Sequence, residues 1–460
     1  MSTNNNGKSA SRRKLLQWTG SAGSAAVLAA LAGCSGSQNE GDGGDNGGSD
    51  SSSNSDRGDG GSEYASIEFW SKEQQAERRQ IISPMVEEFG QAEVSAEFFD
   101  EDNIPEELSS ARAAGNLPNV LQVQAQTIQN LGSERILSTD SAQAVMESIG
   151  MDDFRDGALE FMSTPDGEYY AVPHDGWVQG FWYRESKFEE LGLPEPTTWE
   201  NIREAAEALH DPENNQYGIG LGTESGNFAR QAFTPFAISN GARVFNEEGE
   251  IVFDSPEMVE ALEFYVELAQ DYGHPGKHAY DATRQTYVNE NSHMIMWSSY
   301  IIDDLLEVEM ADDTGFAPYV RQESDASYGQ VTGFGITASD NAAEQRTAEA
   351  FTEHMFQSDQ YVDWLHMAPG GMQSVRQSIS ESDAYQDNEV LNAWEDTVAI
   401  ISSALDNVQR FGFVNGRSIP EFGQIASRLL VADAVVRVYE GEDAEIVAEE
   451  QAEAMRQAIE

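Results

Sequence analysis

Cysteine is almost absent from this chain of 460 residues, which has only Cys34. A single thiol excludes an intramolecular disulfide and a thiolate zinc site, and no other cysteine could act as a nucleophile. The HExxH, GxxxxGK[ST] and GxSxG motifs are missing too, and no GxGxxG follows a predicted strand. These absences predict no enzyme activity, no cofactor and no metal centre.

Histidine offers no metal site either. The seven histidines are scattered, and only His274 and His278 have the spacing of two ligands on one helical turn. Pro275 and Gly276 lie between them and predict a turn instead of a helix. The pattern therefore gives no support for a metal ion.

Positive charge is scarce, and lysine especially so. The chain has 26 basic and 81 acidic residues, and only five of the basic ones are lysine. Residues 1–33 hold four basic and no acidic residues, so the other 22 basic residues leave a formal charge of −59 on the remainder. Nucleic acid is excluded as a partner, because phosphate binding needs clustered Lys and Arg.

This acid-rich, lysine-poor composition resembles that of extreme halophiles, haloarchaea in particular. Molar salt shortens the Debye length to ~3 Å and so screens the self-repulsion of such a chain. We therefore expect the fold to need high salt. For the same reason, pairs such as Asp152-Asp153 and Asp303-Asp304 are interpreted as solvated surface, not as catalytic or metal-binding pairs.

The N-terminal region has the features of a targeting signal. Arg12 and Arg13 form a twin-arginine pair, residues 25–32 are a short apolar run, and Leu31-Ala32-Gly33-Cys34 closes it. This resembles a twin-arginine signal peptide that ends in a lipobox. A transmembrane helix is disfavoured because spanning needs ~20 apolar residues, and a plain secretory signal because the cysteine directly follows Leu-Ala-Gly. Residues 1–33 are predicted to be removed and Cys34 to be lipidated, so that the only membrane contact is the lipid anchor.

Composition then divides the rest of the chain. Residues 34–62 are predicted to be the lipidated cysteine and a disordered Gly/Ser/Asp tether, because so few apolar residues cannot form a core. Its 28 residues after Cys34 would reach ~30 Å. Ordered structure should begin near Tyr64, and about 400 residues favour two domains over one.

Short apolar segments alternate with longer amphipathic ones in this region. The alternation predicts an α/β class with mostly parallel sheets. The predicted strands are 67–70 and 119–123, and the predicted helices are 74–89, 257–272, 343–357 and 425–439.

One segment resembles a known family. Residues 167–209 give a hairpin-like GEYYAVP strand, a second strand through Phe181 and Tyr183, and a helix capped by Thr198 with Trp199 in its first turn. This order resembles the extracellular solute-binding proteins that serve ABC importers, in the branch that contains maltose-binding protein. The resemblance continues over residues 64–460 through SNGARVFNEEGEIVFDSPEMVEALEFYVEL, NENSHMIMWSSY, VTGFGITASDNAAEQRTAEAFTEHMF and HMAPGGMQSVR.

Three departures leave the ligand open. Arg184 stands where the family usually has Asn after two aromatic residues. Ser298-Ser299-Tyr300 replaces a Gly-x-Trp sequence, and the proline often found in the glycine turn is missing at Met372-Gln373-Ser374. The fold implied by the resemblance is unaffected.

The resemblance implies a two-lobed α/β fold of the type II periplasmic-binding-protein class. Hinge crossings would join the lobes, and the ligand would bind in the cleft between them. The expected N-lobe is residues 64–174 plus about 329–367. The expected C-lobe is about 176–325 plus 371–460.

By the same resemblance, the candidate ligand-binding residues lie where the family faces its cleft. Trp182 and Trp199 are assigned to core packing, and packing also competes as the role of each other aromatic residue. The candidates are Trp70 and Glu73 after the first strand, Gln124 and Gln126 after the second, Asp175 and Trp177 at the first hinge crossing, Trp297 and Tyr300 in the aromatic pocket segment, and Gly333 and Gly371 at turns of close approach.

Three functions compete. The leading one is a membrane-tethered, monomeric receptor on the extracellular face that binds a sugar or polyol by lobe closure and delivers it to ABC permease subunits. The second is the same receptor for a glycerol phosphodiester, a polyamine or a metal complex; a polyamine would need excess cleft carboxylates, and phosphate would need cleft arginines. The third is a secreted carbohydrate hydrolase, which would need two carboxyl groups ~5–9.5 Å apart.

Overall fold

The computed structural model describes residues 64–101, 103–414 and 417–459. The predicted signal peptide with Arg12 and Arg13, the predicted lipidation site Cys34 and the predicted tether lie outside the described residues. Among the described residues, no helix combines the length and the apolar character needed to cross a membrane.

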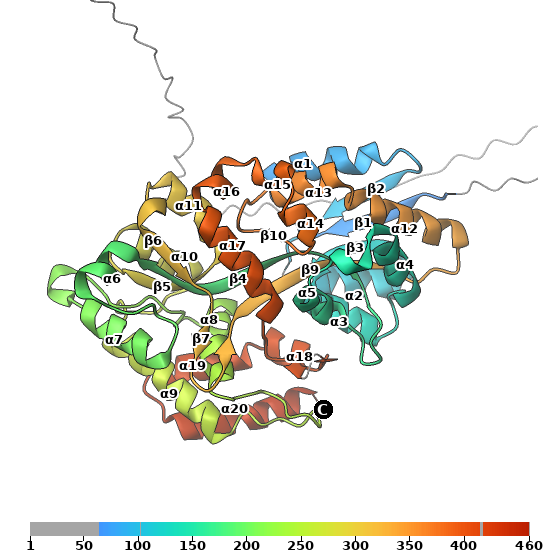
Figure 1. The fold of residues 1–460 in the computed structure, drawn as a ribbon. Helices are drawn as coiled ribbons and strands as arrows, with labels where there is room; N and C mark the ends of the chain where they lie inside the picture. Colours follow the sequence, from blue (N-terminus) through green and yellow to red (C-terminus); the bar gives the residue numbers. More distant parts are fainter. Residues whose placement is uncertain (1–63, 102, 415–416, 460) are drawn as a thin grey trace, which may run out of the picture. The chain divides into compact units, whose positions relative to one another are not determined.

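Three parallel strands form one side of the main sheet (Figure 1). In β1 (Ile67–Ser71), Phe69 and Trp70 are buried, and the strand pairs in parallel with β2 (Val94–Phe98) on one side and β3 (Val120–Gln124) on the other. The predicted strands at 67–70 and 119–123 are confirmed within one residue at their ends.

Two longer strands continue the sheet. In antiparallel fashion, β9 (Tyr328–Ile336) pairs with β3 and with the first half of β4 (Val172–Arg184). From Gln179 onward, β4 pairs instead with β5 (Met294–Ser298) and β6 (Thr314–Ala317). We call the part around β1, β2, β3 and β9 the N-lobe and the part around β5 and β6 the C-lobe. The single strand β4 thus runs from one lobe into the other.

Two details of the predicted strands were wrong. Only the β1–β2 and β1–β3 pairings of this sheet are parallel, since β9, β4, β5, β6 and β10 (Gln373–Ser374) all pair antiparallel. The first strand predicted between residues 167 and 183 is mostly absent, because β4 begins only at Val172 and then runs unbroken through Phe181 and Tyr183. Gly180 permits the close pairing there, because a Cβ at this position would lie 2.3 Å from the carbonyl oxygen of Ala317.

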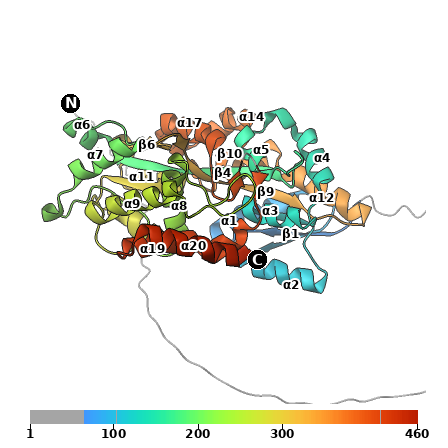
Figure 2. The same cartoon turned by 90° about the horizontal axis from the view of Figure 1, so that it is seen from below.

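The helices cover the sheet in two groups. In the N-lobe, α12 packs on α4 and on β1, α3 lies against β9, and α1 contacts α13. In the C-lobe, α8 and α9 pack together and are covered by α19 and α20, which run side by side beneath them (Figure 2). The N-lobe helices are α1 (Ala76–Glu88), α2 (Ile104–Ala114), α3 (Ala125–Ser133), α4 (Thr139–Ile149), α5 (Asp156–Met162), α12 (Ala342–Met355) and α13 (Ser358–Leu365). The longer C-lobe helices are α7 (Trp199–Leu209), α8 (Asn227–Ser239), α9 (Pro256–Asp271), α10 (Tyr280–Val288), α19 (Leu430–Tyr439) and α20 (Ala444–Ile459).

Local sequence sets the ends of these helices. The side chain of Ser255 accepts a hydrogen bond from the backbone N–H of Met258, and Pro256 occupies the first turn of α9, where its missing N–H leaves no bond unmade. The predicted helices 257–272 and 343–357 are confirmed. The predicted helix 425–439 is two helices, α18 (Phe422–Ser427) and α19, because Leu429 takes a left-handed φ of 56° that a helix cannot continue.

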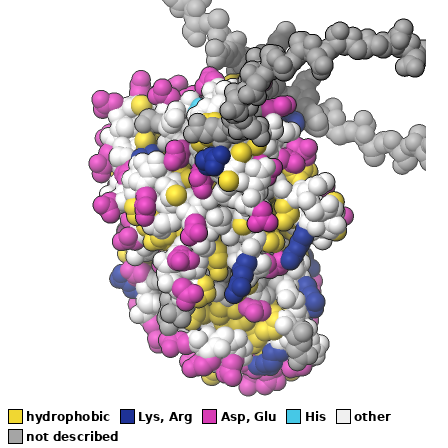
Figure 3. Space-filling model, turned by 90° about the vertical axis from the view of Figure 1, so that its right-hand side faces the viewer, with side chains coloured by type: hydrophobic (Ala, Val, Ile, Leu, Met, Phe, Trp, Pro, Cys, Tyr) yellow, Lys and Arg dark blue, Asp and Glu magenta, His cyan; other side chains and the backbone are white. Residues whose placement is uncertain are grey.

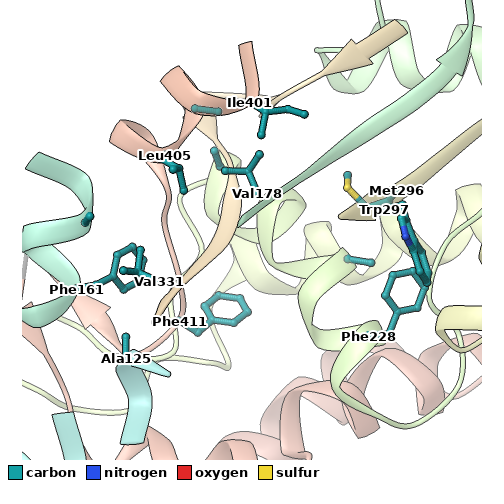
Figure 4. Close-up of a cluster of buried hydrophobic side chains, with 14 of the residues drawn as sticks. Ala125, Phe161, Val178, Phe228, Met296, Trp297, Val331, Ile401, Leu405 and Phe411 are labelled. Atoms are coloured by element: carbon teal, nitrogen blue, oxygen red, sulfur yellow. The ribbon is translucent and has the colours of Figure 1, made fainter. Parts of the chain in front are cut away.

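The core crosses from lobe to lobe along the shared strands. In Figure 4, Val178 of β4 lies beside Ile401 and Leu405, while Trp297 lies over Phe228 of α8. Trp182 is fully buried and donates its indole N–H to the carbonyl oxygen of Trp297 at 3.1 Å, and Trp199 stacks on Phe264 with ring centroids 4.1 Å apart. The assignment of Trp182 and Trp199 to the core is confirmed.

The contacts of the segment after β10 show which lobe it belongs to, just beyond the predicted hinge at 367–371. Arg376 forms an ion pair with Asp153 of the N-lobe at 2.9 Å, and the Ser378 N–H donates to the same carboxylate at 2.7 Å. Farther on, the Gln409 N–H donates to the carbonyl oxygen of Ser327. Residues 373–380 therefore belong with the N-lobe. The other lobe boundaries stay a prediction.

Candidate functional site

A cavity of about 460 Å³ lies where the two lobes meet beside β4. The N-lobe supplies the residues that follow β1, β2 and β3, which is the carboxyl end of its parallel strands and the usual edge for a binding site. The C-lobe supplies the start of α8, the start of α10 and the end of β5. Its lining consists of Lys72, Glu73, Gln74, Gln75, Arg78, Asp100, Glu101, Gln124, Trp177, Asn227, Arg230, Gln231, Tyr280, Ser298 and Tyr300.

A buried ionic cluster forms the N-lobe wall. Glu73 is fully buried, and its two carboxylate oxygens accept hydrogen bonds from Lys72 Nζ, at 2.5 Å, and from Arg78 Nη1. Burial by itself would raise the pKa of Glu73, but the charges of Lys72 and Arg78 hold it below its ordinary value. Burial would likewise lower the pKa of Lys72, yet Glu73 and Glu101 raise it. All three groups are therefore ionised at neutral pH.

Two aromatic rings face the cavity from the crossing strand and the C-lobe. The rings of Trp177 and Tyr300 are edge to face, with centroids 6.4 Å apart, and the Arg78 guanidinium lies 5.9 Å from the Tyr300 centroid. Burial raises the pKa of Tyr300, so its hydroxyl stays protonated and can both donate and accept. The pair offers an apolar surface next to charged groups.

Tyr300 is held from behind by the turn that contains Gly371. A Cβ at Gly371 would lie 2.6 Å from Cδ1 of Tyr300, and the Ser299 hydroxyl donates to the carbonyl oxygen of Gly371 at 3.2 Å. The close approach predicted at Gly371 is therefore a contact with Tyr300, which lines the cavity.

The far wall comes from the C-lobe and is polar. The Tyr280 hydroxyl donates to Oε1 of Gln231 at 2.6 Å, and Arg230 Nη2 donates to Oδ1 of Asn227 at 3.2 Å. These residues lie on α8 and at the start of α10. The cavity thus has hydrogen-bonding groups on both lobes and aromatic rings between them.

Charge in the cavity differs from charge elsewhere. Its lining has three basic residues (Lys72, Arg78, Arg230) and three acidic ones (Glu73, Asp100, Glu101), whereas the chain as a whole has 26 and 81. Acidic side chains are spread over the face shown in Figure 3, where basic ones are fewer. Among the residues with described side chains, no group of three or more His, Cys, Asp or Glu is arranged to hold a metal ion.

Four of the predicted site residues line this cavity. Glu73 follows β1, Gln124 is the last residue of β3, Trp177 lies on β4, and Tyr300 follows β5. Strand ends in the expected order were enough to place them.

The other predicted residues do not line it. Trp70 packs on Phe99 with ring centroids 4.6 Å apart, and Trp297 is 7% exposed, behind Tyr280 and Phe228. Gln126 bonds Asn130 at 3.2 Å on the first turn of α3.

Asp175 and Gly333 lie within the sheet. Asp175 is fully buried and bonds Nδ1 of His174 at 3.0 Å and the Thr332 hydroxyl at 2.5 Å, an arrangement that holds its pKa below the ordinary value against the effect of burial. A Cβ at Gly333 would meet Met162 at 2.9 Å, so this glycine serves strand packing. Asp175 is thus a buried residue of β4 itself, and Gly333 lies on the neighbouring strand β9.

The basic residues of the cavity were not among the predicted site residues. Lys72 is one of only five lysines and directly follows the first strand, which was a usable signal. Arg230 and Gln231 sit in a helix whose residues 228–239 are all buried. Two long polar side chains in such an apolar stretch need a polar neighbour, and the cavity provides it.

The fold and the site define a class: a two-lobed α/β protein of type II periplasmic-binding architecture, with an interlobe cavity for a small polar solute. Residues 80–393 match the family of bacterial extracellular solute-binding proteins. A putative ABC transporter periplasmic-binding protein of Escherichia coli, YcjN, is 30% identical over 381 residues, which cover 82% of this chain and 88% of that relative. This chain belongs to the bacterial extracellular solute-binding protein family.

Further similarity is partial or limited to the fold. The mannitol-binding protein of Pseudomonas aeruginosa is 28% identical over 193 residues, which cover 40% of this chain and 44% of that relative. The crystal structure of an ABC transporter solute-binding protein from Thermotoga lettingae, bound with α-D-tagatose, matches with a TM-score of 0.68 at 19% identity, covering 86% of this chain and all of that one. The predicted two-lobed α/β fold is confirmed.

Proposed function

We propose that this protein is the substrate-binding component of an ABC importer and that it binds a sugar or polyol by closure of its lobes. The observation that carries the proposal is the cavity itself, where Trp177 and Tyr300 lie between hydrogen-bonding side chains of both lobes. A sugar has an apolar face for such rings and hydroxyls for the polar groups around them. Relatives that bind mannitol and tagatose support this choice of solute.

Closure follows from the division of the cavity between the lobes. A solute that touches Glu73 and Gln124 in the N-lobe and Gln231 in the C-lobe makes all its contacts only when the lobes are close together. Solute therefore shifts the population toward the closed state, which the permease subunits would recognise. The 13-residue strand β4 is the natural place for the bend.

The charges in the cavity speak against two alternatives. A polyamine would need an excess of carboxylates, but acidic and basic residues are equal in number there. A glycosidase needs a carboxylic acid with a raised pKa as its proton donor. The pKa of Glu73 is lowered instead, and both its oxygens are occupied by cations. Binding without chemistry is the simpler role.

We also propose that the receptor is monomeric and is held on the extracellular face of the membrane by lipid on Cys34. The lipobox and the twin arginines Arg12 and Arg13 support this location, as does membership of an extracellular family. Cys34→Ala should release the protein into the medium. Unchanged membrane retention of that variant would contradict the anchor.

A thermal-shift screen in multimolar KCl tests the solute class. The panel contains D-mannitol, D-ribitol, D-tagatose, maltose, D-glucuronate, glycerol phosphodiesters and spermidine. A true ligand at 100 times its Kd should add ~2.7 kcal/mol to the free energy of unfolding. The increase should disappear in Trp177→Ala. If no carbohydrate or polyol, neutral or acidic, raises the unfolding temperature, the proposed function fails.

A further inference from the structure

Two arginines are buried without the ion pair that most of the described arginines form. Ten described arginines form ion pairs with carboxylates, at positions 78, 112, 155, 184, 203, 284, 321, 376, 437 and 456. Arg230 and Arg410 are 7% and 4% exposed and form no such pair within the described residues. Nε of both side chains and Nη1 of Arg410 are buried without a hydrogen-bond partner.

Burying an unpaired guanidinium is unfavourable, and in this chain it is also unexpected. Desolvation of a charge costs several kcal/mol unless hydrogen bonds and an opposite charge offset it. Acidic residues outnumber basic ones by 81 to 26, so a carboxylate partner was easily available to both arginines. Burial lowers the pKa of Arg410, which reflects this missing compensation. The free donors are best explained by a partner that comes from outside the chain.

Arg230 lines the main cavity, and Arg410 is connected to that cavity through an aromatic side chain. Arg230 lines the main cavity from α8, and its guanidinium lies 5.9 Å from the ring of Phe422. The guanidinium of Arg410 lies 5.7 Å from the ring centroid of Tyr328, and Tyr328 contacts Trp177 with centroids 5.8 Å apart. Tyr328 is therefore in contact with both Arg410 and the aromatic wall of the main cavity.

Arg410 also borders a second cavity of about 370 Å³. Other charged groups around it are Arg243, which donates to the carbonyl oxygens of Ile238 and Ala242, and the carboxylates of Glu160 and Asp406. Glu101, after β2, and Arg230 also act electrostatically on Arg410. None of these carboxylates forms an ion pair with Arg410 in the described part of the chain.

We infer that the solute is a polyhydroxylated molecule with one anionic group, a carboxylate or a phosphate, and that Arg230 and Arg410 bind this group. Guanidinium groups suit it because their planar donors match a carboxylate or phosphate in charge and geometry. Lys72 and Arg78 are occupied by Glu73, so the anion has its free donors at the Arg410 end. The hydroxylated body would then lie against Trp177 and Tyr300. This inference rests on the proposed function and deepens it.

The experiment compares acids with neutral analogues by titration calorimetry in multimolar KCl. The probes are D-glucuronate and D-mannonate for carboxylates, D-mannitol 1-phosphate for phosphate, and D-glucuronamide and D-mannitol as neutral counterparts. We expect one acid to bind about tenfold or more tightly than its neutral counterpart, because hydrogen bonds to charged groups contribute ~1.5–3 kcal/mol. The acid that binds more tightly shows whether the anionic group of the solute is a carboxylate or a phosphate.

Variants then locate the anion. Arg410→Gln and Arg230→Gln should each lose about tenfold or more of the affinity for the acid and a smaller share of the affinity for neutral polyols. The control is Arg203→Gln, which removes a guanidinium paired with Glu267 on the outer surface. If Arg410→Gln does not fold, Arg230→Gln and the comparison of acid with neutral probe on the unmodified protein decide the question.

The outcomes separate this inference from the proposed function. Tight binding of a neutral polyol with no preference for any acid would overturn the anionic group but leave the receptor intact. Acid binding that survives both substitutions would overturn the role of the two arginines. If no probe of either kind binds, the proposed function fails together with this inference.

Discussion

The cleft and the outer surface of this chain use charge in opposite ways. In the cleft, Glu73 is 1% exposed in its side chain and is held between Lys72 and Arg78, which are 10% and 20% exposed. On the surface, the pair between Arg203 and Glu267 is 44% and 40% exposed and lies among many more acids than bases. Desolvated charges are strongly coupled and little affected by salt, whereas exposed charges are weakly coupled and screened. Acidic and basic residues therefore form the binding site in the cleft, whereas on the outer surface they keep the protein soluble.

Glu73→Gln is expected to give the largest effect. It leaves Lys72 and Arg78 beside a neutral amide, and breaking a buried ion pair in this way destabilises a protein by ~3–5 kcal/mol. We expect the lower end, because both cations retain some exposure. Denaturant unfolding at constant KCl measures the change. Glu267→Gln is the matched control, and an equal loss in both variants would erase the contrast between cleft and surface.

The pH dependence of stability should sharpen the same contrast. The pKa of Glu73 is lowered in the folded state from an ordinary value of about 4.5, so its ionised form stabilises the fold above that pH. This stabilisation is lost as the pH falls from about 4.5 through the lower folded pKa. Over that range the unmodified protein should lose more stability than Glu73→Gln, which has no carboxylate there to titrate. Parallel curves for the two proteins would contradict the assignment.

The fold and four of the fifteen cavity residues could be predicted from the sequence for physical reasons. Strand ends and helix starts are local features, so Glu73, Gln124, Trp177 and Tyr300 could be placed from their order in the chain. Whether Trp70 or Trp297 faces a cavity depends on what packs against it, and Phe99 and Phe228 are distant in sequence. Antiparallel pairing of β4 and β9 joins segments about 150 residues apart, which no local pattern specifies.

Tyr300→Ala tests whether the cleft aromatics bind the solute. Removing a central aromatic contact typically costs at least ~2 kcal/mol, or about 30-fold in affinity. We expect that loss for the ligand found in the screen, with a smaller change in stability. Tyr319→Ala, on a half-buried tyrosine away from the cavity, should leave the affinity unchanged. If Tyr300→Ala left the affinity unchanged, the solute would bind somewhere other than against this ring.

Gly371→Ala should have a related but smaller effect. The new methyl group would lie 2.6 Å from the Tyr300 ring and force it toward the cavity. Overpacking of this kind costs ~1–3 kcal/mol, shared between stability and ring position. Calorimetry should show about a tenfold weaker Kd at most. The double variant with Tyr300→Ala should recover part of the lost stability, because the clash is then gone. Additive losses would mean that the turn does not act through Tyr300.

The smallest effect is expected on the surface. In a double-mutant cycle with Arg203→Ala and Glu267→Ala, the coupling energy of this exposed pair should be ~0.2–1 kcal/mol in dilute buffer. In molar KCl the Debye length of ~3 Å should reduce it further. The overall fold should behave in the opposite sense and become more stable with salt, because the net charge of −55 repels itself. If coupling and stability both fell with salt, the acidic surface would not be an adaptation to high ionic strength. If the coupling instead stayed large and salt-independent, exposure would not be what separates this pair from Glu73 and its two cations.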